Sequence, residues 1–189
     1  MLRRGEVLEI KNSGEVYAEV NNYSDYDDTS RTDINLMGEQ YLENNFWIDY
    51  QIGKTYIKDE DDGNTANLET EKIGLRYTSR KWNSLIAVNL FGLDSNDKTG
   101  LYVDTSFNPS DREVINFIYS SEPVYNANVI NNYDGGLFSD NYSLRYNYIF
   151  NNRESSYIEL RKSDFDDDNK RYGWEVGHQY IINNELDNG

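Results

Sequence analysis

Bulky apolar or aromatic residues alternate with small or polar residues along the stretch from 142 to 180. In the run 142–150 every second residue is Tyr, Leu or Phe, and the residues between them are mostly polar. The run 172–180 repeats this pattern, with Trp174 and Val176 at one parity and Glu175 at the other. Successive side chains of a β-strand point to opposite faces of its sheet. The alternation therefore predicts strands with one apolar and one polar face.

The same alternation occurs along the whole chain and predicts an all-β fold. We expect an antiparallel meander of about ten strands, each long enough for a tilted strand of an outer-membrane β-barrel. No stretch predicts a helix. The expected strands are 6–22, 32–41, 46–57, 67–78, 83–91, 98–107, 113–121, 142–150, 156–162 and 172–180.

The connections between these strands alternate in character. Those after the even-numbered strands are short and carry some Arg and Lys, whereas those after the odd-numbered strands are generally longer and mostly acidic, as at 59–62 and 164–168. Consecutive connections of a meander lie at opposite ends of the strands. The sequence thus predicts one end of tight turns and one end of acidic loops, an asymmetry typical of outer-membrane barrels. A soluble β-rich module with solvated acidic loop tips is the alternative.

Composition narrows the range of functions. The chain has 189 residues and a formal net charge of -16 at pH 7, which argues against a nucleic-acid partner. Low apolar content alone would favour disorder, but 17 Tyr, 7 Phe and 3 Trp placed in strict alternation favour a sheet that is wetted on one face. There is no Cys, so neither a disulfide framework nor a thiolate site is expected.

Few residues are candidates for catalysis or metal binding. His178 is the sole histidine, and it shares a face with aromatic residues. It would be the base if the chain were a small outer-membrane barrel hydrolase, which we keep as an alternative. The loop that begins at Asp164 resembles an EF-hand loop only in part, because Asn169 stands where glycine is required. We therefore expect no catalytic residue, no metal site and no cofactor.

The polar face of the predicted sheet is the candidate functional surface. If the aromatic face meets lipid, the opposite face lines a lumen that holds carboxylates, arginines and interleaved aromatic residues, including Glu9, Lys11, Glu39, Lys72 and Arg76. Acidic groups there would attract a partly cationic cargo. The residues that we expect along a polysaccharide path are Glu15, Tyr17, Glu19, Asp33, Trp47, Asp49, Tyr102, Asp104, Arg145, Glu159, Arg161 and Glu175.

Three segments carry a family resemblance. They are 74–82, 145–146 with 152–153, and 164–171 followed by 177–179. In this order they resemble the C-terminal barrel of PgaA-type outer-membrane porins, which export the biofilm polysaccharide poly-N-acetylglucosamine. The resemblance runs from about Leu8 to Tyr180.

The resemblance implies a fold and partners beyond what the residues alone indicate. It implies a periplasmic helical-repeat domain, where a polysaccharide deacetylase docks, followed by a barrel of about sixteen strands. It also implies the bacterial outer membrane as location and export of partly deacetylated polymer through an acidic lumen. This sequence shows no helical repeats and fewer strands. We therefore expect residues 1–189 to be a single β-barrel region that lacks the N-terminal repeat domain and the C-terminal strands.

Overall fold

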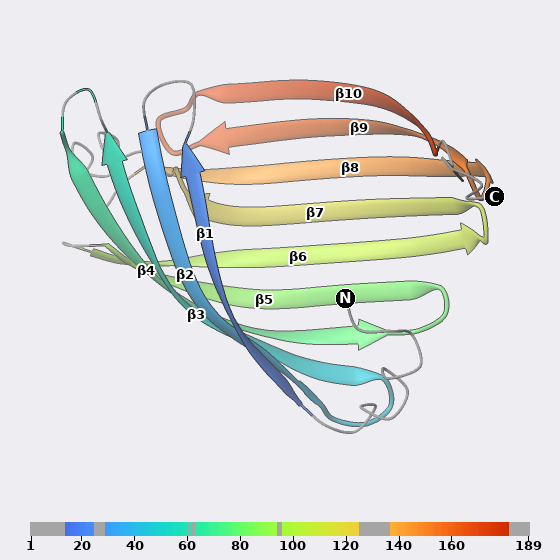
Figure 1. The fold of residues 1–189 in the computed structure, drawn as a ribbon, viewed down its shortest axis with the longest axis horizontal. Coiled ribbons are helices and arrows are strands. Elements are labelled where there is room, and N and C mark those ends of the chain that lie inside the picture. The colour runs from blue at the N-terminus through green and yellow to red at the C-terminus, as the bar shows by residue number, and fades with distance from the viewer. Residues whose placement is uncertain are drawn as a thin grey trace, which may run out of the picture.

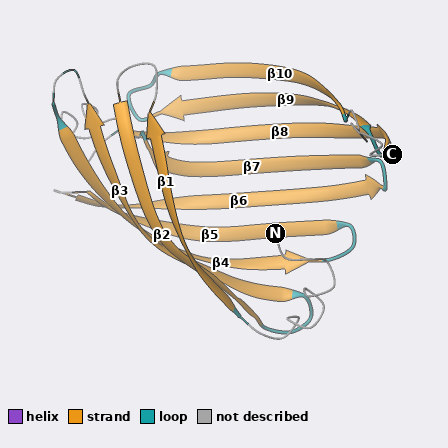
Figure 2. Ribbon diagram, viewed as in Figure 1, coloured by secondary structure: helices purple, strands orange, loops and turns teal. Residues whose placement is uncertain are grey.

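The protein is a single ten-stranded antiparallel sheet in which strand order follows sequence order (Figures 1 and 2). The computed structural model describes residues 14–24, 29–59, 61, 63–93, 96–124 and 137–181. No helix among them is long and apolar enough to cross a membrane. The strands are β1 (Glu15–Ser24), β2 (Thr29–Tyr41), β3 (Phe46–Asp59), β4 (Thr65–Thr78), β5 (Trp82–Leu93), β6 (Asn96–Ser110), β7 (Glu113–Pro123), β8 (Phe138–Asn151), β9 (Glu154–Phe165) and β10 (Lys170–Tyr180).

The predicted all-β meander is confirmed, but the strands run further than their apolar pattern indicates. Gly92 pairs with Asp97, so the connection between β5 and β6 is only 94–95 instead of 92–97. The predicted difference between long acidic loops and tight turns is therefore weaker than expected at this hairpin. It is strongest after β7 (Glu113–Pro123), because the next strand that the structure describes, β8, begins at Phe138. Residues 6–13 of the first expected strand, including Glu9 and Lys11, lie outside the described residues.

The sheet is strongly curved, with β1–β4 inclined across the ends of β5–β10 (Figure 1). Tyr17 of β1, Arg76 of β4 and Asp104 of β6 line one hollow, so the face that carries them is concave. Neighbouring strands pair in order, and β1 does not pair with β10, so the sheet is not closed. The turns after β4, β6 and β8 gather at one end of the sheet and the loop between β9 and β10 lies at the other (Figure 1).

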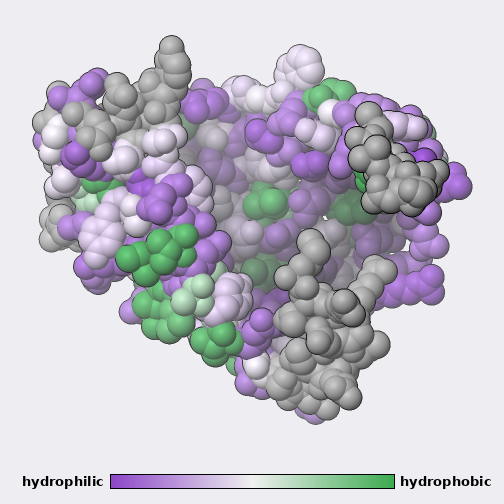
Figure 3. All heavy atoms as spheres, viewed as in Figure 1, coloured by the Kyte–Doolittle hydropathy of each residue, from purple (hydrophilic) through white to green (hydrophobic). Residues whose placement is uncertain are grey.

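The convex face holds the exposed apolar side chains. Each strand contributes every second residue to this face, and large hydrophobic groups there are open to the surroundings. Figure 3 shows hydrophobic atoms on the outer surface of the front strands, beside a largely hydrophilic hollow. Members of this convex set are Val16, Val20, Ile34, Leu36, Phe46, Ile52, Ile73, Leu75, Ile86, Val88, Leu101, Phe117, Leu144, Leu160, Trp174 and Val176.

Aromatic pairs border the convex face near the tight turns. Phe46 lies 5.2 Å from Tyr77 across β3 and β4, measured between ring centroids, and Trp82 stacks on Phe107 at 4.4 Å across β5 and β6. These are directly opposed cross-strand neighbours, the positions at which paired side chains stabilise a sheet. A band of aromatic residues at one height is a feature of outer-membrane barrels.

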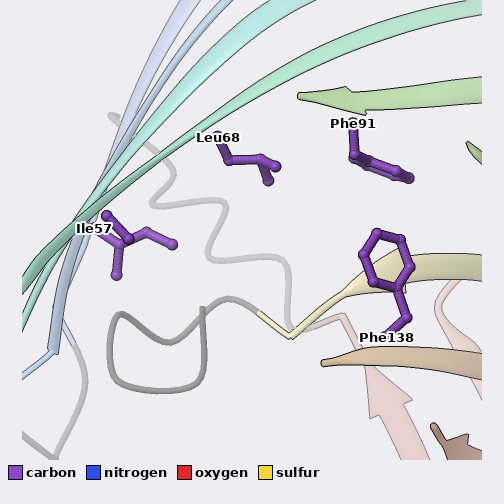
Figure 4. Packing of buried hydrophobic residues seen from close by; sticks show 5 residues of the cluster. Ile57, Leu68, Phe91 and Phe138 are labelled. Atoms are coloured by element: carbon purple, nitrogen blue, oxygen red, sulfur yellow. The ribbon is translucent and has the colours of Figure 1, made fainter. Parts of the chain in front are cut away.

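The only buried hydrophobic cluster among the described residues lies on the concave side, near the acidic loops (Figure 4). It joins Ile57 of β3, Ala66 and Leu68 of β4, Phe91 of β5 and Phe138 of β8. The rest of the concave face is mainly polar, so the molecule reverses the usual arrangement of an apolar inside and a polar outside.

Candidate channel lining

All of the expected path residues lie on the concave face. The register explains this, because Asp104 opposes Ile118, which opposes Ser143, which opposes Arg161, so the first six strands and the last three share one inner surface. The residues form separate groups along that surface. One group lies on β1–β3 (Glu15, Tyr17, Glu19, Asp33, Trp47, Asp49), one on β6 (Tyr102, Asp104) and one on β8–β10 (Arg145, Glu159, Arg161, Glu175).

Next to the first group, Arg76 of β4 lies between the carboxylates of Asp49 and Glu39. Its Nε donates to Asp49 Oδ2 at 3.0 Å, and its Nη2 donates to Asp49 Oδ1 and to Glu39. The guanidinium also lies 5.8 Å from the ring centroid of Trp47. The hollow beside this group has a volume of about 300 Å³ and is also lined by Tyr17, Asn83, Leu85 and Asp104.

Gly74 of β4 and Ala87 of β5 oppose each other close to Leu85, which lines this hollow. A Cβ at Gly74 would lie 2.7 Å from Cβ of Ala87 and 2.9 Å from Cδ1 of Leu85. Contacts that short do not occur between real carbon atoms, so only glycine fits where β4 and β5 approach each other here.

Asp33 is saturated by polar partners. It is 5 % exposed, and it accepts hydrogen bonds from Arg31 Nε at 2.8 Å and from Thr55 Oγ1 at 2.7 Å. Arg31 Nη2 lies 2.7 Å from its second oxygen. A cationic ligand would have to displace Arg31 to reach this carboxylate, so Asp33 is held as part of the wall.

Asp104 has a different environment. Its contacts within the described chain are neutral donors: Asn116 Nδ2 at 3.1 Å and the hydroxyl of Tyr102 at 3.5 Å. Lys72 Nζ lies over the ring of Tyr102, 5.1 Å from its centroid. Asp104 therefore lines the hollow as a carboxylate that no arginine in the described part of the chain contacts.

The third group is a chain of arginines and glutamates across β8, β9 and β10. Arg161 donates to Glu159 through Nε at 2.6 Å and to Glu175 through Nη2 at 2.9 Å. Arg145 stacks on Tyr157, with Cζ 3.7 Å from the ring centroid, and the Tyr157 hydroxyl donates to Glu175. Ser143 adds a further hydrogen bond to Glu159 at 2.8 Å. Glu159 is as saturated as Asp33.

Alternation alone did not single out all the residues that matter here. Tyr157 has the inward parity but is not among the expected path residues. Tyr41, whose ring lies 4.9 Å from that of Trp47, also has the inward parity. Counting every aromatic residue at inward positions would have found both.

His178 lies on the convex face. Its Nδ1 is 2.8 Å from the hydroxyl of Ser156, and its Nε2 is 3.6 Å from Glu154 Oε1. The Asp164 loop turns back on itself through Asp168, whose φ is 66°, and Phe165 N donates to Asn169 O. Among the described residues no group of three or more His, Cys, Asp or Glu is arranged to hold a metal ion.

Comparison with known proteins places the fold. No family model and no curated protein matches the sequence. Among solved structures, a bacterial polysaccharide outer membrane secretin is similar with a TM-score of 0.74 and 14% identity, over 91% of this chain and 58% of the secretin. The outer membrane channel DcaP of Acinetobacter baumannii is similar with a TM-score of 0.51 and 10% identity, over 88% of this chain and 61% of that channel.

The fold is that of an outer-membrane β-barrel wall. Both similar structures are transport channels rather than enzymes. The chain spans about 58% of the length of the secretin. At these identities the likeness concerns the fold.

Proposed function

We propose that this chain forms part of the wall of an outer-membrane channel through which a bacterial polysaccharide is exported. The observation that carries the proposal is the match of nearly the whole sheet to a polysaccharide secretin, combined with a concave face rich in carboxylates. The convex apolar face fits contact with membrane lipid, and such a large exposed apolar surface has no role in a soluble module.

We propose partly deacetylated poly-N-acetylglucosamine as the cargo, because its free amines are cationic and the lining is acidic. The carboxylates differ in what they offer an ammonium group. Asp33 and Glu159 are already occupied by arginine. Among the described residues Asp104 has only neutral partners, and Asp49 shares Arg76 with Glu39. We expect Asp104 first, and Asp49 second, to contact the passing polymer, while the other path residues shape the wall.

Among the described strands β1 and β10 are the two edges of the sheet, and such edges fit a wall that is completed by further strands, in line with the predicted larger barrel. A deacetylase partner that docks through a helical-repeat domain also stays a prediction. The further strands and the deacetylase partner concern the whole protein, and the contacts expected of Asp104 and Asp49 do not depend on them.

Secretion of the polymer by variants tests the proposal. In cells that export the polymer through this protein, the double variant Asp49→Asn/Asp104→Asn should reduce secreted polymer several-fold while heat-modifiable mobility in gels shows normal insertion. Asp33→Asn serves as the comparison, because its effect should follow the amount of inserted protein. Full secretion by the double variant would contradict a lining role for these acids.

A hydrolase is the second candidate, favoured by the contact between Ser156 and His178 on the convex face. A hydroxyl hydrogen-bonded to an imidazole is the minimum arrangement for nucleophilic attack on an ester. Fluorogenic acyl esters in detergent would reveal such activity. Activity that His178→Ala and Ser156→Ala both abolish would support it, and activity that survives both changes would eliminate this pair.

A further inference from the structure

The three tight turns after β4, β6 and β8 are basic, although the formal net charge of the chain is -16. Between the strand ends these turns are residues 79–81, 111–112 and 152–153, which we call the basic rim. The rim holds four exposed basic residues and one exposed carboxylate: Arg80, Lys81, Arg112, Arg153 and Asp111. The connection between β9 and β10, at the opposite end of the sheet, holds three aspartates and no basic residue in 166–169. Positive charge is therefore concentrated at one end.

Hydrogen bonds from side chains fix the basic residues at set positions of their turns. The backbone N–H of Arg112 donates to Ser110 Oγ at 3.3 Å, and that of Arg153 donates to Asn151 Oδ1 at 2.9 Å. Side-chain acceptors two residues earlier in the chain stabilise tight turns. The basic side chains thus project from ordered backbone.

Backbone hydrogen bonds also join the neighbouring turns to one another. Asn108 N donates to the carbonyl oxygen of Lys81 at 2.9 Å, and Ile149 N donates to that of Arg112 at 2.8 Å. The first bond links the turn after β4 to the end of β6, and the second links the turn after β6 to the end of β8. The rim is therefore one continuous structure along the end of the sheet (Figure 1).

Two hollows lie between the turns of the rim. The first, between the turns after β4 and β6, has a volume of about 610 Å³ and is lined by Arg80 and Lys81. The second, between the turns after β6 and β8, has a volume of about 520 Å³ and is lined by Arg112 and Arg153. Asp111 lies between them and lines both. Each hollow thus has two basic residues beside it.

Most of these cations have no carboxylate partner within the chain. Asp111, whose side chain is 96 % exposed, approaches Arg80 only to 4.0 Å. Within the described part of the chain no ion pair joins Lys81, Arg112 or Arg153 to a carboxylate. An ion pair between two fully exposed groups is weak, so Arg80 is also available to another anion.

Two glutamates at the starts of the following strands are bound by neutral groups instead. Glu113 accepts hydrogen bonds from Ser110 Oγ at 2.8 Å and from the Tyr146 hydroxyl at 2.9 Å. Glu154 accepts one from Asn151 Nδ2 at 3.2 Å. These carboxylates therefore contact polar side chains of their own surroundings rather than the arginines of the rim.

Exposed aromatic residues of the convex face lie directly next to the rim in the chain. Trp82 follows Lys81, and Phe150 precedes Arg153 by three residues. Both aromatic side chains are 45 % exposed. Aromatic residues at the border of a lipid-facing surface mark the membrane–water interface. Basic residues just beyond them are then at the level of the lipid phosphate groups.

We propose that the basic rim binds anionic phospholipids, with one headgroup in the hollow at Arg80 and Lys81 and another in the hollow at Arg112 and Arg153. The proposal goes beyond the cargo and rests on the proposed contact of the convex face with membrane lipid. Guanidinium groups bind phosphate through paired hydrogen bonds, and a lysine ammonium adds a point charge. The adjacent aromatic residues favour a lipid over an acidic protein, because the acyl chains of a bound lipid would lie along the convex face.

The fluorescence of Trp82 tests the first hollow. The full chain with Trp47→Phe/Trp174→Phe retains only this tryptophan. It is inserted into phosphatidylcholine vesicles that contain brominated phosphatidylglycerol, and then into vesicles in which phosphatidylcholine is the brominated lipid. The two quenching curves give the relative binding constant of the lipids next to Trp82. Phosphatidylglycerol should be favoured several-fold at low salt, and the preference should fall as salt screens the charges.

Charge-removing variants show whether the rim is responsible. Arg80→Gln/Lys81→Gln should bring the two lipids close to equal binding, and both side chains are exposed, so folding should not suffer. Lys170→Gln/Arg171→Gln removes the same charge at the opposite end of the sheet and should leave the preference unchanged. A preference that survives Arg80→Gln/Lys81→Gln would overturn the proposal. Equal binding by the wild-type rim would also overturn it and would favour an acidic protein surface as the partner.

The second hollow needs a reporter of its own. Phe150 lines it, so Phe150→Trp in a chain whose native tryptophans are replaced by Phe places the fluorophore there. The same several-fold preference for phosphatidylglycerol is expected, and Arg112→Gln/Arg153→Gln should remove it. Equal quenching by both lipids before that change would eliminate the second headgroup site.

The outcomes also distinguish this inference from the proposed function. If phosphatidylglycerol is favoured at the rim while the cells secrete no polysaccharide through the protein, the lipid site stands and the proposed cargo is wrong. If polymer is secreted and the rim shows no lipid preference, the cargo stands and the lipid site is wrong.

Discussion

The two faces of the sheet are made by alternate residues of the same strands, yet their interactions differ in kind. On β3, Ile52 projects from the convex face and is 60 % exposed, while Trp47 and Asp49 on the concave face interact with Arg76. A convex side chain needs mainly to be apolar. A concave side chain needs to match the particular groups that it contacts. We therefore expect the convex face to tolerate apolar exchange but not charge, and the concave face to do the opposite.

The largest effect should come from placing a charge on the convex face. Val88 lies between Ile73 and Leu101 on the neighbouring strands, in the middle of the apolar set. Val88→Arg should lower the free energy of unfolding in phospholipid vesicles by about 2–4 kcal/mol, because the guanidinium would be held in hydrocarbon. Urea titration followed by tryptophan fluorescence measures the change.

A matched arginine on the concave side of the same strand completes that comparison. Asn83 lines the polar hollow and accepts a hydrogen bond from Thr78. Asn83→Arg should change stability by less than about 1 kcal/mol, since its charge stays in water. Equal destabilisation by the two arginines would show that the faces are not divided between lipid and water.

The next largest loss of stability should come from removing the charge of a concave carboxylate that arginine contacts. Glu159→Gln removes the negative charge that Arg161 and Ser143 contact and leaves Arg145 with one acid fewer. We expect a loss of about 1–2 kcal/mol, less than for a fully buried pair, because Arg161 is half exposed. Asp104→Asn should be nearly neutral, since its partners are uncharged.

Chemical denaturation of both variants measures this difference. A smaller loss for Glu159→Gln than for Asp104→Asn would contradict the division into saturated and available carboxylates. If the division holds, only Asp104→Asn should reduce polymer secretion without reducing the amount of inserted protein.

The alternation of the sequence predicted the fold and the face on which each expected path residue lies, because a period of two is strong in nearly every strand. It did not predict which arginine meets which carboxylate. Arg76 reaches both Asp49 on the adjacent strand and Glu39 one strand further on, and that depends on register and curvature. Nor did it predict the inward ring of Phe138, whose position is set by a contact with Phe91 across two other strands. Periodicity defines faces, whereas tertiary geometry defines partners.

The smallest change in stability is expected for single-Trp variants, which keep one of the three tryptophans each. Their fluorescence reports directly which face of the sheet meets lipid. Trp174 and Trp82 lie on the convex face, 76 % and 45 % exposed, and Trp47 lies on the concave face beside Tyr41. In vesicles with brominated acyl chains, Trp174 and Trp82 should be quenched strongly, while Trp47 should respond to aqueous acrylamide instead. Phe replaces Trp in each variant, so stability should change little. Quenching of Trp47 by the brominated lipid would place the concave face in hydrocarbon and remove the basis for a polar lining.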